Sequence, residues 1–387
     1  MFKVIFDKTC KDIIVPFQRK SIRELFSKNA SLLNIAFPVK FFITVEHDED
    51  NNCWMAKFNI EKSSADKFYI AFNSFWVEGF APRNKRQVLI VDRTILHEVI
   101  HGLDILNISD SHNKRRMNYH EVWALLNKDS EKSNFFWVVM YYFTLLRDEG
   151  LALYGETLFH GSDNIHSTET LQEMLVHDLE WLLIQMEENG SKSVDLDAMF
   201  SRVYAYGSYV YECMFEADRT SKQASVHIHE LMNMDLSHWI WLFFKRLMPH
   251  QVHRLLSHYS SQNLKWFGTL IRSKSSSFDN PKGLLMDYFQ ECRINPLVDD
   301  HFNVIRNRYV ENMLAADSEW VSERYQNDLH LMVHQRLVRI WDTLDDELQR
   351  YSLAYFLTSQ DQLHDELTFI GHLDDMFLLD YIEEHLC

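Results

Sequence analysis

The feature that most constrains the fold of this chain is its shortage of helix-breaking residues. Only 10 glycines and 6 prolines occur among 387 residues, which is roughly a third of the usual share of each. Proline removes a helical hydrogen bond and glycine weakens a helix, so long segments free of both favour α-helix. With 46% hydrophobic residues, the chain can also fill a sizeable core. We therefore expect a predominantly helical protein.

The charge balance and the cysteines limit the class of protein. Lys+Arg 39 against Asp+Glu 56 gives a net charge of -17, which argues against nucleic-acid binding because such proteins present a basic surface to phosphates. The 5 cysteines are scattered, odd in number and without a CxxC pair, which suits reduced thiols better than a disulfide framework. The N-terminus lacks a signal-peptide pattern, and the longest apolar run, residues 135–146, is too short to span a bilayer. These features predict a cytoplasmic protein with no transmembrane segment.

Residue patterning predicts three parts in the chain. An N-terminal segment, residues 1–37, holds a helical pattern. From residue 38, runs of β-branched and aromatic residues bounded by turn residues predict strands at 41–45, 54–60, 68–72 and 88–91. Helical spacing follows, and a polar linker is predicted at 272–283. We expect an α+β, predominantly helical fold, in which a small N-terminal β-sheet packs on a helical body (residues 38–271), followed by an all-helical C-terminal domain (residues 284–387).

The strongest local motif is HEVIH, which begins at His97 and ends at His101. Two histidines four residues apart lie on one face of a helix, so both imidazoles can bind one zinc ion. Glu98 lies beside them and can accept a proton from metal-activated water. The N-cap of this helix would be Asp92 or Thr94. The alternative is a helix that merely packs, with histidines that bind no metal.

A catalytic zinc ion needs a third protein ligand and an open coordination position. The segment DEGLALYGE, which follows a hydrophobic helical run, supplies Glu149 as a candidate. The spacing predicts that Glu149 lies at the start of a second helix. The small residues Gly150 and Ala152 would let this helix approach the first one closely.

HEVIH followed by DEGLALYGE resembles the gluzincin zinc metallopeptidases, in which HExxH lies on one helix and a glutamate ligand on the next. The resemblance implies that His97, His101 and Glu149 bind one zinc ion per chain, and that Glu98 is the general base. Because ligand histidines usually donate their second N–H to an oxygen, nearby carboxylates could orient them, although each could equally be a surface group. These carboxylates are Asp104, Asp148 and Glu156.

A third segment, residues 202–214, is similar to the YxxGxxFxxxL helix of many gluzincin-like peptidases. Tyr204 and Gly207 stand at its tyrosine and glycine positions. The family often uses a tyrosine or histidine to stabilise the oxyanion, and Tyr204 is the candidate that we name as catalytic. The other candidates for this role are Tyr206, His227 and His229.

The end of the chain resembles the YkvA-like bacterial domain of unknown function. Asp361, Gly371 and the run Leu373-Asp374-Asp375 occupy positions of that pattern, whereas its prolines are absent. This resemblance implies a bacterial source and no particular chemistry. The residues alone indicate a helical hairpin with Gly371 in the turn and Asp374 at the start of the last helix.

The expected function is zinc-dependent hydrolysis of a peptide bond by metal-activated water, with a peptide or protein as substrate. Members of the resembled family commonly bind extended substrates along an edge strand near the active-site helix. The candidate segments are 54–60 and 68–76. Three alternatives stay open: a non-catalytic zinc-binding interaction protein with a peptidase fold, a zinc hydrolase acting on a non-peptide amide or ester, and a peptidase whose C-terminal domain chooses a single protein target.

Overall fold

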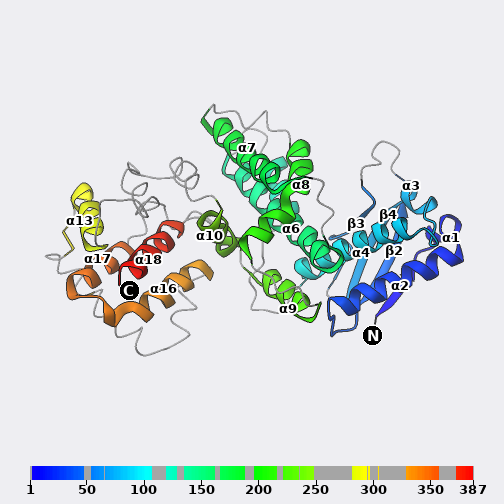
Figure 1. Ribbon diagram of the computed structural model, residues 1–387, viewed down its shortest axis with the longest axis horizontal. Coiled ribbons are helices and arrows are strands. Elements are labelled where there is room, and N and C mark those ends of the chain that lie inside the picture. Colours follow the sequence, from blue (N-terminus) through cyan, green and yellow to red (C-terminus); the bar gives the residue numbers. More distant parts are fainter. Residues whose placement is uncertain are drawn as a thin grey trace. The chain divides into compact units, whose positions relative to one another are not determined.

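The computed structural model describes residues 2–47, 54–64, 66–106, 119–128, 135–161, 166–187, 196–215, 221–234, 236–247, 281–293, 295–296, 304, 328–356 and 372–386. The chain divides into two compact units, Met1–Met234 and Asp235–Cys387. The described residues are mostly helical and include one small sheet in the first unit (Figure 1). The predicted α+β, mainly helical class is therefore confirmed at this level. The division lies well before the predicted linker at 272–283, of which residues 272–280 lie outside the described part.

The sheet has four strands in the order β1-β2-β4-β3. β1 (Lys3–Phe6), β2 (Lys40–Glu46) and β4 (Lys67–Asn73) run parallel, and β3 (Ala56–Phe58) pairs antiparallel with β4. β3 is thus an edge strand, within the segment predicted for that role. β4 has a neighbour on both sides, so the predicted alternative at 68–76 is wrong: the segment is an inner strand that continues into the short helix α3 (Ser74–Glu78).

One face of the sheet is buried and the other is half-exposed. Along β2 the buried residues alternate with partly exposed ones, as expected for a strand with one packed face. Phe41 on the packed face lies 4.9 Å, ring centre to ring centre, from Phe26 of α2 (Pro16–Leu32). Phe42 on the other face stacks on Tyr69 of β4 at 4.7 Å. A short helix, α1 (Cys10–Ile13), links β1 to α2.

Helix α4 (Lys85–Leu106) carries the HEVIH motif and starts earlier than predicted. Asn84 is the capping residue, since its side-chain oxygen accepts hydrogen bonds from the backbone N–H groups of Arg86 and Gln87 at 3.0 and 3.3 Å. The strand predicted at 88–91 and the N-cap predicted at Asp92 or Thr94 are therefore wrong. A short apolar run does not distinguish a strand from a helix, and here it continues the helical spacing of the motif.

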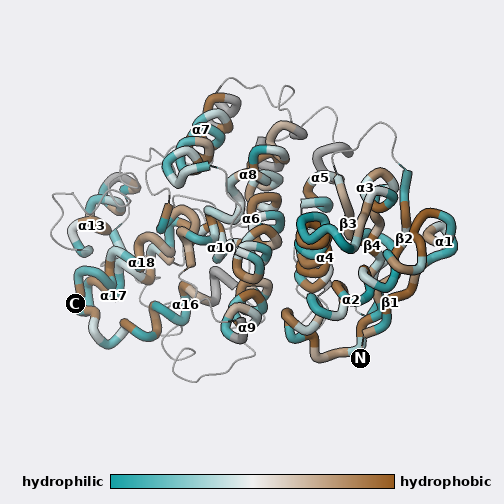
Figure 2. The backbone as a smooth tube through the Cα atoms, turned by 45° about the vertical axis from the view of Figure 1, so that its right-hand side comes forward, coloured by the Kyte–Doolittle hydropathy of each residue, from teal (hydrophilic) through white to brown (hydrophobic). Residues whose placement is uncertain are grey.

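The described part of the first unit has five further helices: α5 (Tyr119–Lys128), α6 (Phe135–His160), α7 (Thr168–Glu187), α8 (Leu196–Met214) and α9 (Ser221–Met232). Brown stretches of α4 and α6 in Figure 2 mark their apolar residues. Glu149 lies in the middle of α6, not at a helix start as predicted. Gly150 approaches α8 rather than α4, because a Cβ on Gly207 would lie 2.9 Å from the Cα of Gly150. The glycine of α6 that faces α4 is Gly155, which contacts Ile100.

The described part of the second unit is helical, as predicted for the C-terminal domain. It comprises α10 (Leu236–Arg246), α13 (Pro281–Cys292), α16 (Asp328–Ile340), the 3-10 turn η4 (Trp341–Thr343), α17 (Asp346–Phe356) and α18 (Leu373–Leu386). α10 belongs to this unit because it packs on α16 and α18, where Lys245 and Arg336 both pair with Asp380 at 2.8 and 2.7 Å. Among all described residues, no helix is both long and apolar enough to cross a membrane.

The C-terminal motif lies partly within the described residues. Asp361 and Gly371 fall outside them, so the predicted turn is untested. Asp374 lies in the first turn of α18, where its carboxylate accepts a 2.7 Å hydrogen bond from the hydroxyl of Tyr355.

Candidate metal centre

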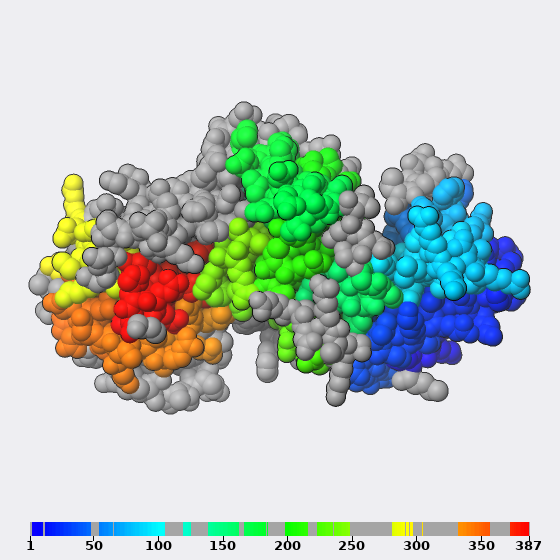
Figure 3. Space-filling view, in the orientation of Figure 1, coloured from blue at the N-terminus to red at the C-terminus, as the bar shows by residue number. Residues whose placement is uncertain are grey.

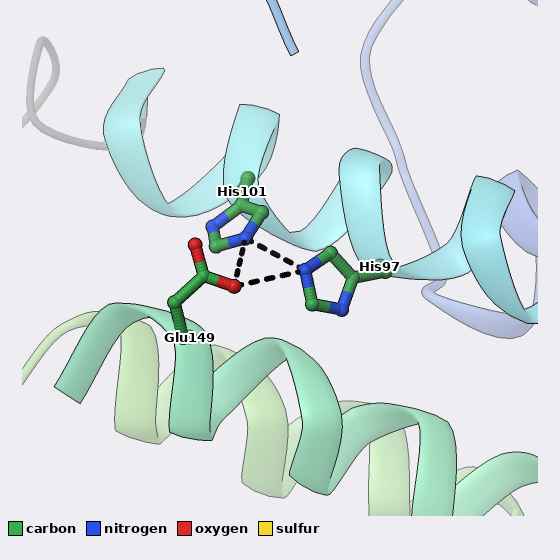
Figure 4. A group of neighbouring side chains, drawn as sticks. All are labelled: His97, His101 and Glu149. Carbon is green, nitrogen blue, oxygen red and sulfur yellow. Dashed lines mark hydrogen bonds and ion pairs between the residues drawn. The ribbon is translucent and has the colours of Figure 1, made fainter. Parts of the chain in front are cut away.

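His97, His101 and Glu149 converge in the interior of the first unit. The two histidines project from successive turns of α4, and Glu149 reaches them from α6 (Figure 4). The Nε2 atoms of His97 and His101 lie 3.0 Å apart, and the Glu149 Oε2 atom lies 3.2 and 3.4 Å from them. All three residues are buried. The structure thus brings together the three residues that the sequence proposed as ligands.

These distances suit a tetrahedral metal ion. Bonds of about 2.0–2.2 Å from zinc to nitrogen or oxygen place neighbouring donor atoms about 3.3 Å apart at the corners of a tetrahedron. The three observed separations, 3.0 to 3.4 Å, match such an edge. Three protein ligands would leave one corner open. The buried His-His-Glu group can therefore hold a metal ion, and its donor atoms suit several divalent metals.

The hydrogen bonding of His97 supports this assignment. Glu156 follows Glu149 by about two turns of α6. Its carboxylate Oε1 atom lies 2.8 Å from Nδ1 of His97. When Nδ1–H donates to Glu156, the Nε2 atom presents a lone pair to the cluster. The Glu149 carboxylate faces the same point, and so does Nε2 of His101, which presents a lone pair there in the tautomer with its proton on Nδ1. Three acceptors that face one another in a buried site require a cation or protons between them.

The histidines and carboxylates of the cluster shift one another's pKa values. Burial opposes the charged form of His97, but Glu149 and Glu156 outweigh it and raise the pKa of His97 well above its ordinary value. Burial likewise opposes ionisation of Glu149, yet His101 and His97 hold the pKa of this carboxyl well below its usual range. The site thus keeps its carboxylate ionised, which is the form that binds metal.

Glu98 lies beside the ligands and is held by the edge strand. Its Oε2 atom accepts a hydrogen bond of 2.6 Å from the backbone N–H of Phe58 in β3. Burial raises the pKa of Glu98 to about 7, against the opposing effect of His97 and His101. A carboxylate with a pKa near neutrality is suited to take up and release a proton.

Tyr204 is the predicted oxyanion candidate that lies at the site. Its hydroxyl is 3.0 Å from Nε2 of His97, although the residue as a whole is 42% exposed. The other three candidates make contacts elsewhere. Tyr206 hydrogen-bonds Tyr142 and Asp178, the ring of His227 lies against Tyr154, and His229 donates to the carbonyl of Leu33.

Of the three carboxylates predicted to orient the ligands, Glu156 contacts Nδ1 of the proposed ligand His97. Asp104 and Asp148 instead bind the buried guanidinium of Arg147. Arg147 donates to both oxygens of Asp104 at 2.6 and 2.8 Å, and to Asp148 at 2.6 Å. This network ties α4 to α6 beside Glu149.

The ligands lie in a cleft of about 650 Å³. Its walls come from β3 and its flanks, α4, α5, α6 and α8, and they include aromatic side chains and carboxylates. Tyr119 of α5 also lies in this cleft, although no motif marks it in the sequence. Burial, and after it the negative charges of Glu149 and Glu98, raise the pKa of Tyr119 well above its ordinary value. Its position could not be predicted, because Tyr119 is 30 residues from Glu149 in the sequence and lies in no recognised motif.

No family model, curated protein or solved structure matches the chain.

The contact between Glu156 and His97 gives a first prediction. We expect Glu156→Ala to weaken metal binding by about 10- to 100-fold without unfolding the protein, because the imidazole loses the acceptor that orients it. Glu173→Ala, on the exposed surface of α7, is the control and should bind metal like the wild type. Competition with a chelating dye measures both affinities. Equal affinities for the two variants would show that Glu156 has no orienting role.

Proposed function

We propose that this chain is a zinc-dependent peptidase with the ligand set of the gluzincins and a zincin-type helical body. The observation that carries the proposal is the convergence of His97, His101 and Glu149 at tetrahedral distances, with Glu98 beside them in the same cleft. If the HExxH match were accidental, there would be no reason for a glutamate about 50 residues away to lie within bonding distance of the same metal position. The proposed metal is zinc because imidazole and carboxylate donors at these separations are typical of its catalytic sites.

Each residue of the site has a proposed part in hydrolysis. A bound zinc ion would supply an activated water and polarise the scissile carbonyl. Glu98 would take the proton from that water and pass it to the leaving amine. The hydroxyl of Tyr204, which lies beside the ligand His97, would donate a hydrogen bond to the developing oxyanion. Glu156 would keep His97 in the tautomer that binds the metal.

The edge strand favours a peptide over a small ester or amide as substrate. The backbone of Met55 and Asn59 bonds to β4, so Ala56 and Phe58 turn their backbone groups toward the other edge of the strand. There the N–H of Phe58 donates to Glu98, which leaves the N–H and C=O of Ala56 and the C=O of Phe58 to face a substrate. The same residues line the cleft. An extended peptide could add to this edge by backbone hydrogen bonds and pass across the ligand set.

A direct test is to incubate the zinc-loaded protein with a mixture of unstructured peptides and analyse the products by mass spectrometry. We expect internal cleavage that a chelator abolishes and added zinc restores. Hydrolysis of simple esters without cleavage of any peptide would contradict the proposal. Cleavage of one protein in a cell lysate, but of no generic peptide, would support zinc-dependent peptide hydrolysis with a single protein target.

Tyr204→Phe tests the oxyanion role. We expect peptide hydrolysis to fall by about 10²- to 10³-fold while zinc content stays the same, because only the hydroxyl donor is lost. Tyr209→Phe on the same helix is the control, since Tyr209 does not line the cleft. Steady-state kinetics should show the loss in kcat rather than in KM. Unchanged kcat in Tyr204→Phe would remove Tyr204 from the mechanism.

A further inference from the structure

Tyr119 of α5 contacts one of the three proposed metal ligands without belonging to the ligand set. Its hydroxyl makes a side-chain hydrogen bond with the carboxylate of Glu149. A phenol is protonated at neutral pH, so Tyr119 donates and the carboxylate accepts. The residues of the cleft come from both sides of the boundary that Figure 3 shows between the blue and cyan surface, which ends at residue 106, and the green surface of the later helices.

The backbone of Tyr119 is held by the buried ion network that ties α4 to α6. Its N–H donates to Oδ2 of Asp148 at 3.2 Å, while Oδ1 of Asp148 accepts from Arg147 at 2.6 Å. Asp148 thus uses one carboxylate oxygen for the network and the other for α5. Because Asp148 and Glu149 are neighbours in α6, one turn of this helix binds both the backbone and the hydroxyl of Tyr119.

Aromatic neighbours also hold the ring of Tyr119. Measured between ring centres, it lies 6.4 Å from Tyr141 on α6 and 6.5 Å from Phe200 on α8. The ring of His120, the next residue of α5, lies 4.0 Å away. A ring packed among α5, α6 and α8 has little freedom to turn its hydroxyl away from Glu149.

The orientation of the Glu149 carboxylate decides whether the ligand set is complete. Its Oε2 atom makes the contacts with both histidines (Figure 4), so a rotated carboxylate would leave two imidazoles without the third ligand. Hydrogen-bond partners of a metal ligand restrict such rotation. We propose that Tyr119 is a positioning residue that holds the Glu149 carboxylate in the orientation that binds the metal. This inference rests on the zinc site of the proposed function.

The zinc affinity of Tyr119→Phe, measured by competition with a chelating dye, tests this role without any substrate. We expect binding to weaken by about 10-fold or more, because the ring stays and only the hydroxyl is lost. The control is Tyr69→Phe, which removes a hydroxyl outside the cleft and should bind zinc like the wild type. Equal affinity of Tyr119→Phe and the wild type would overturn this inference alone. A wild type that binds no zinc would overturn the proposed function with it.

A double-mutant cycle shows whether Tyr119 acts through Glu149. In the Glu149→Ala background, adding Tyr119→Phe should change the remaining zinc affinity by less than about twofold, because the carboxylate that Tyr119 positions is gone. Circular dichroism checks that each variant is folded. The same loss in both backgrounds would overturn the positioning role. Reduced kcat with unchanged zinc affinity in Tyr119→Phe would also overturn it, since Tyr119 would then act on the substrate.

Discussion

Replacing Glu98 by glutamine is expected to lower the rate of peptide hydrolysis by about 10²- to 10⁴-fold, the range that a positioned general base supplies. Glutamine has the same size and can still accept the hydrogen bond from the N–H of Phe58 at the edge strand. It cannot take up the proton of the attacking water. Because the three ligands are untouched, zinc content should remain at about one ion per chain.

The comparison that isolates the chemistry is Glu98→Gln against Glu180→Gln, an exposed residue of α7. Both variants should carry the same amount of zinc and unfold at the same temperature as the wild type. Only Glu98→Gln should lose hydrolysis, measured as kcat on a peptide that the wild type cleaves. Full activity of Glu98→Gln with zinc in place would rule out the mechanism.

The second large effect concerns the buried ion network that joins α4 to α6. Arg147→Met is expected to destabilise the first unit by about 3–5 kcal/mol, because Asp104 and Asp148 would stay buried without the guanidinium that compensates them. Both carboxylates lie within 2.6 Å of Arg147 and all three residues are buried. The loss should shrink at lower pH, since a protonated carboxyl carries no uncompensated charge.

Lys20→Met serves as the control for Arg147→Met, because it also replaces a paired cation by methionine. The pair of Lys20 and Glu24 spans 4.0 Å, and its side chains are 75% and 67% exposed. Its removal should cost no more than about 0.5 kcal/mol. Urea unfolding of the metal-free proteins, followed by circular dichroism, measures both free energies. Similar small losses in the two variants would mean that the network does not hold α4 and α6 together.

The helical spacing of the two histidines, together with the resemblance of the segment around Glu149 to a family motif, led to the core of the candidate site. The i, i+4 pair of histidines fixed their common helix face, and Glu149 stood out through its motif. The position of Glu149 within its helix was missed, because the hydrophobic run before it and DEGLALYGE form one continuous helix, α6. Similarly, the run at 88–91 suits a strand or a helix, and the cap that decides between them is Asn84, outside the run.

Contacts that depend on tertiary packing could not be predicted. Asp104 shares a helix face with the histidines, yet it binds Arg147, a residue 43 positions away. The hydrogen bond from Phe58 to Glu98 involves a backbone group, which no residue pattern records. The close approach of Gly150 to Gly207 brings α6 and α8 together. The sequence shows that each helix has a small residue at this point, but it does not show which helix packs against it. His97, His101 and Glu149 could be named as candidates because metal binding restricts residue type, and for the two histidines it restricts their spacing as well.

The metal content of the purified protein, measured by elemental analysis without added metal, tests directly whether His97, His101 and Glu149 form a zinc site. The proteins to compare are the wild type, Glu149→Ala and the control Glu180→Ala. We expect about one zinc ion per chain in the wild type and the control, and less than about a tenth of that in Glu149→Ala, because two imidazoles alone hold zinc weakly. No zinc in the wild type, even after reconstitution, or equal zinc in all three proteins, would contradict a metal centre at His97, His101 and Glu149.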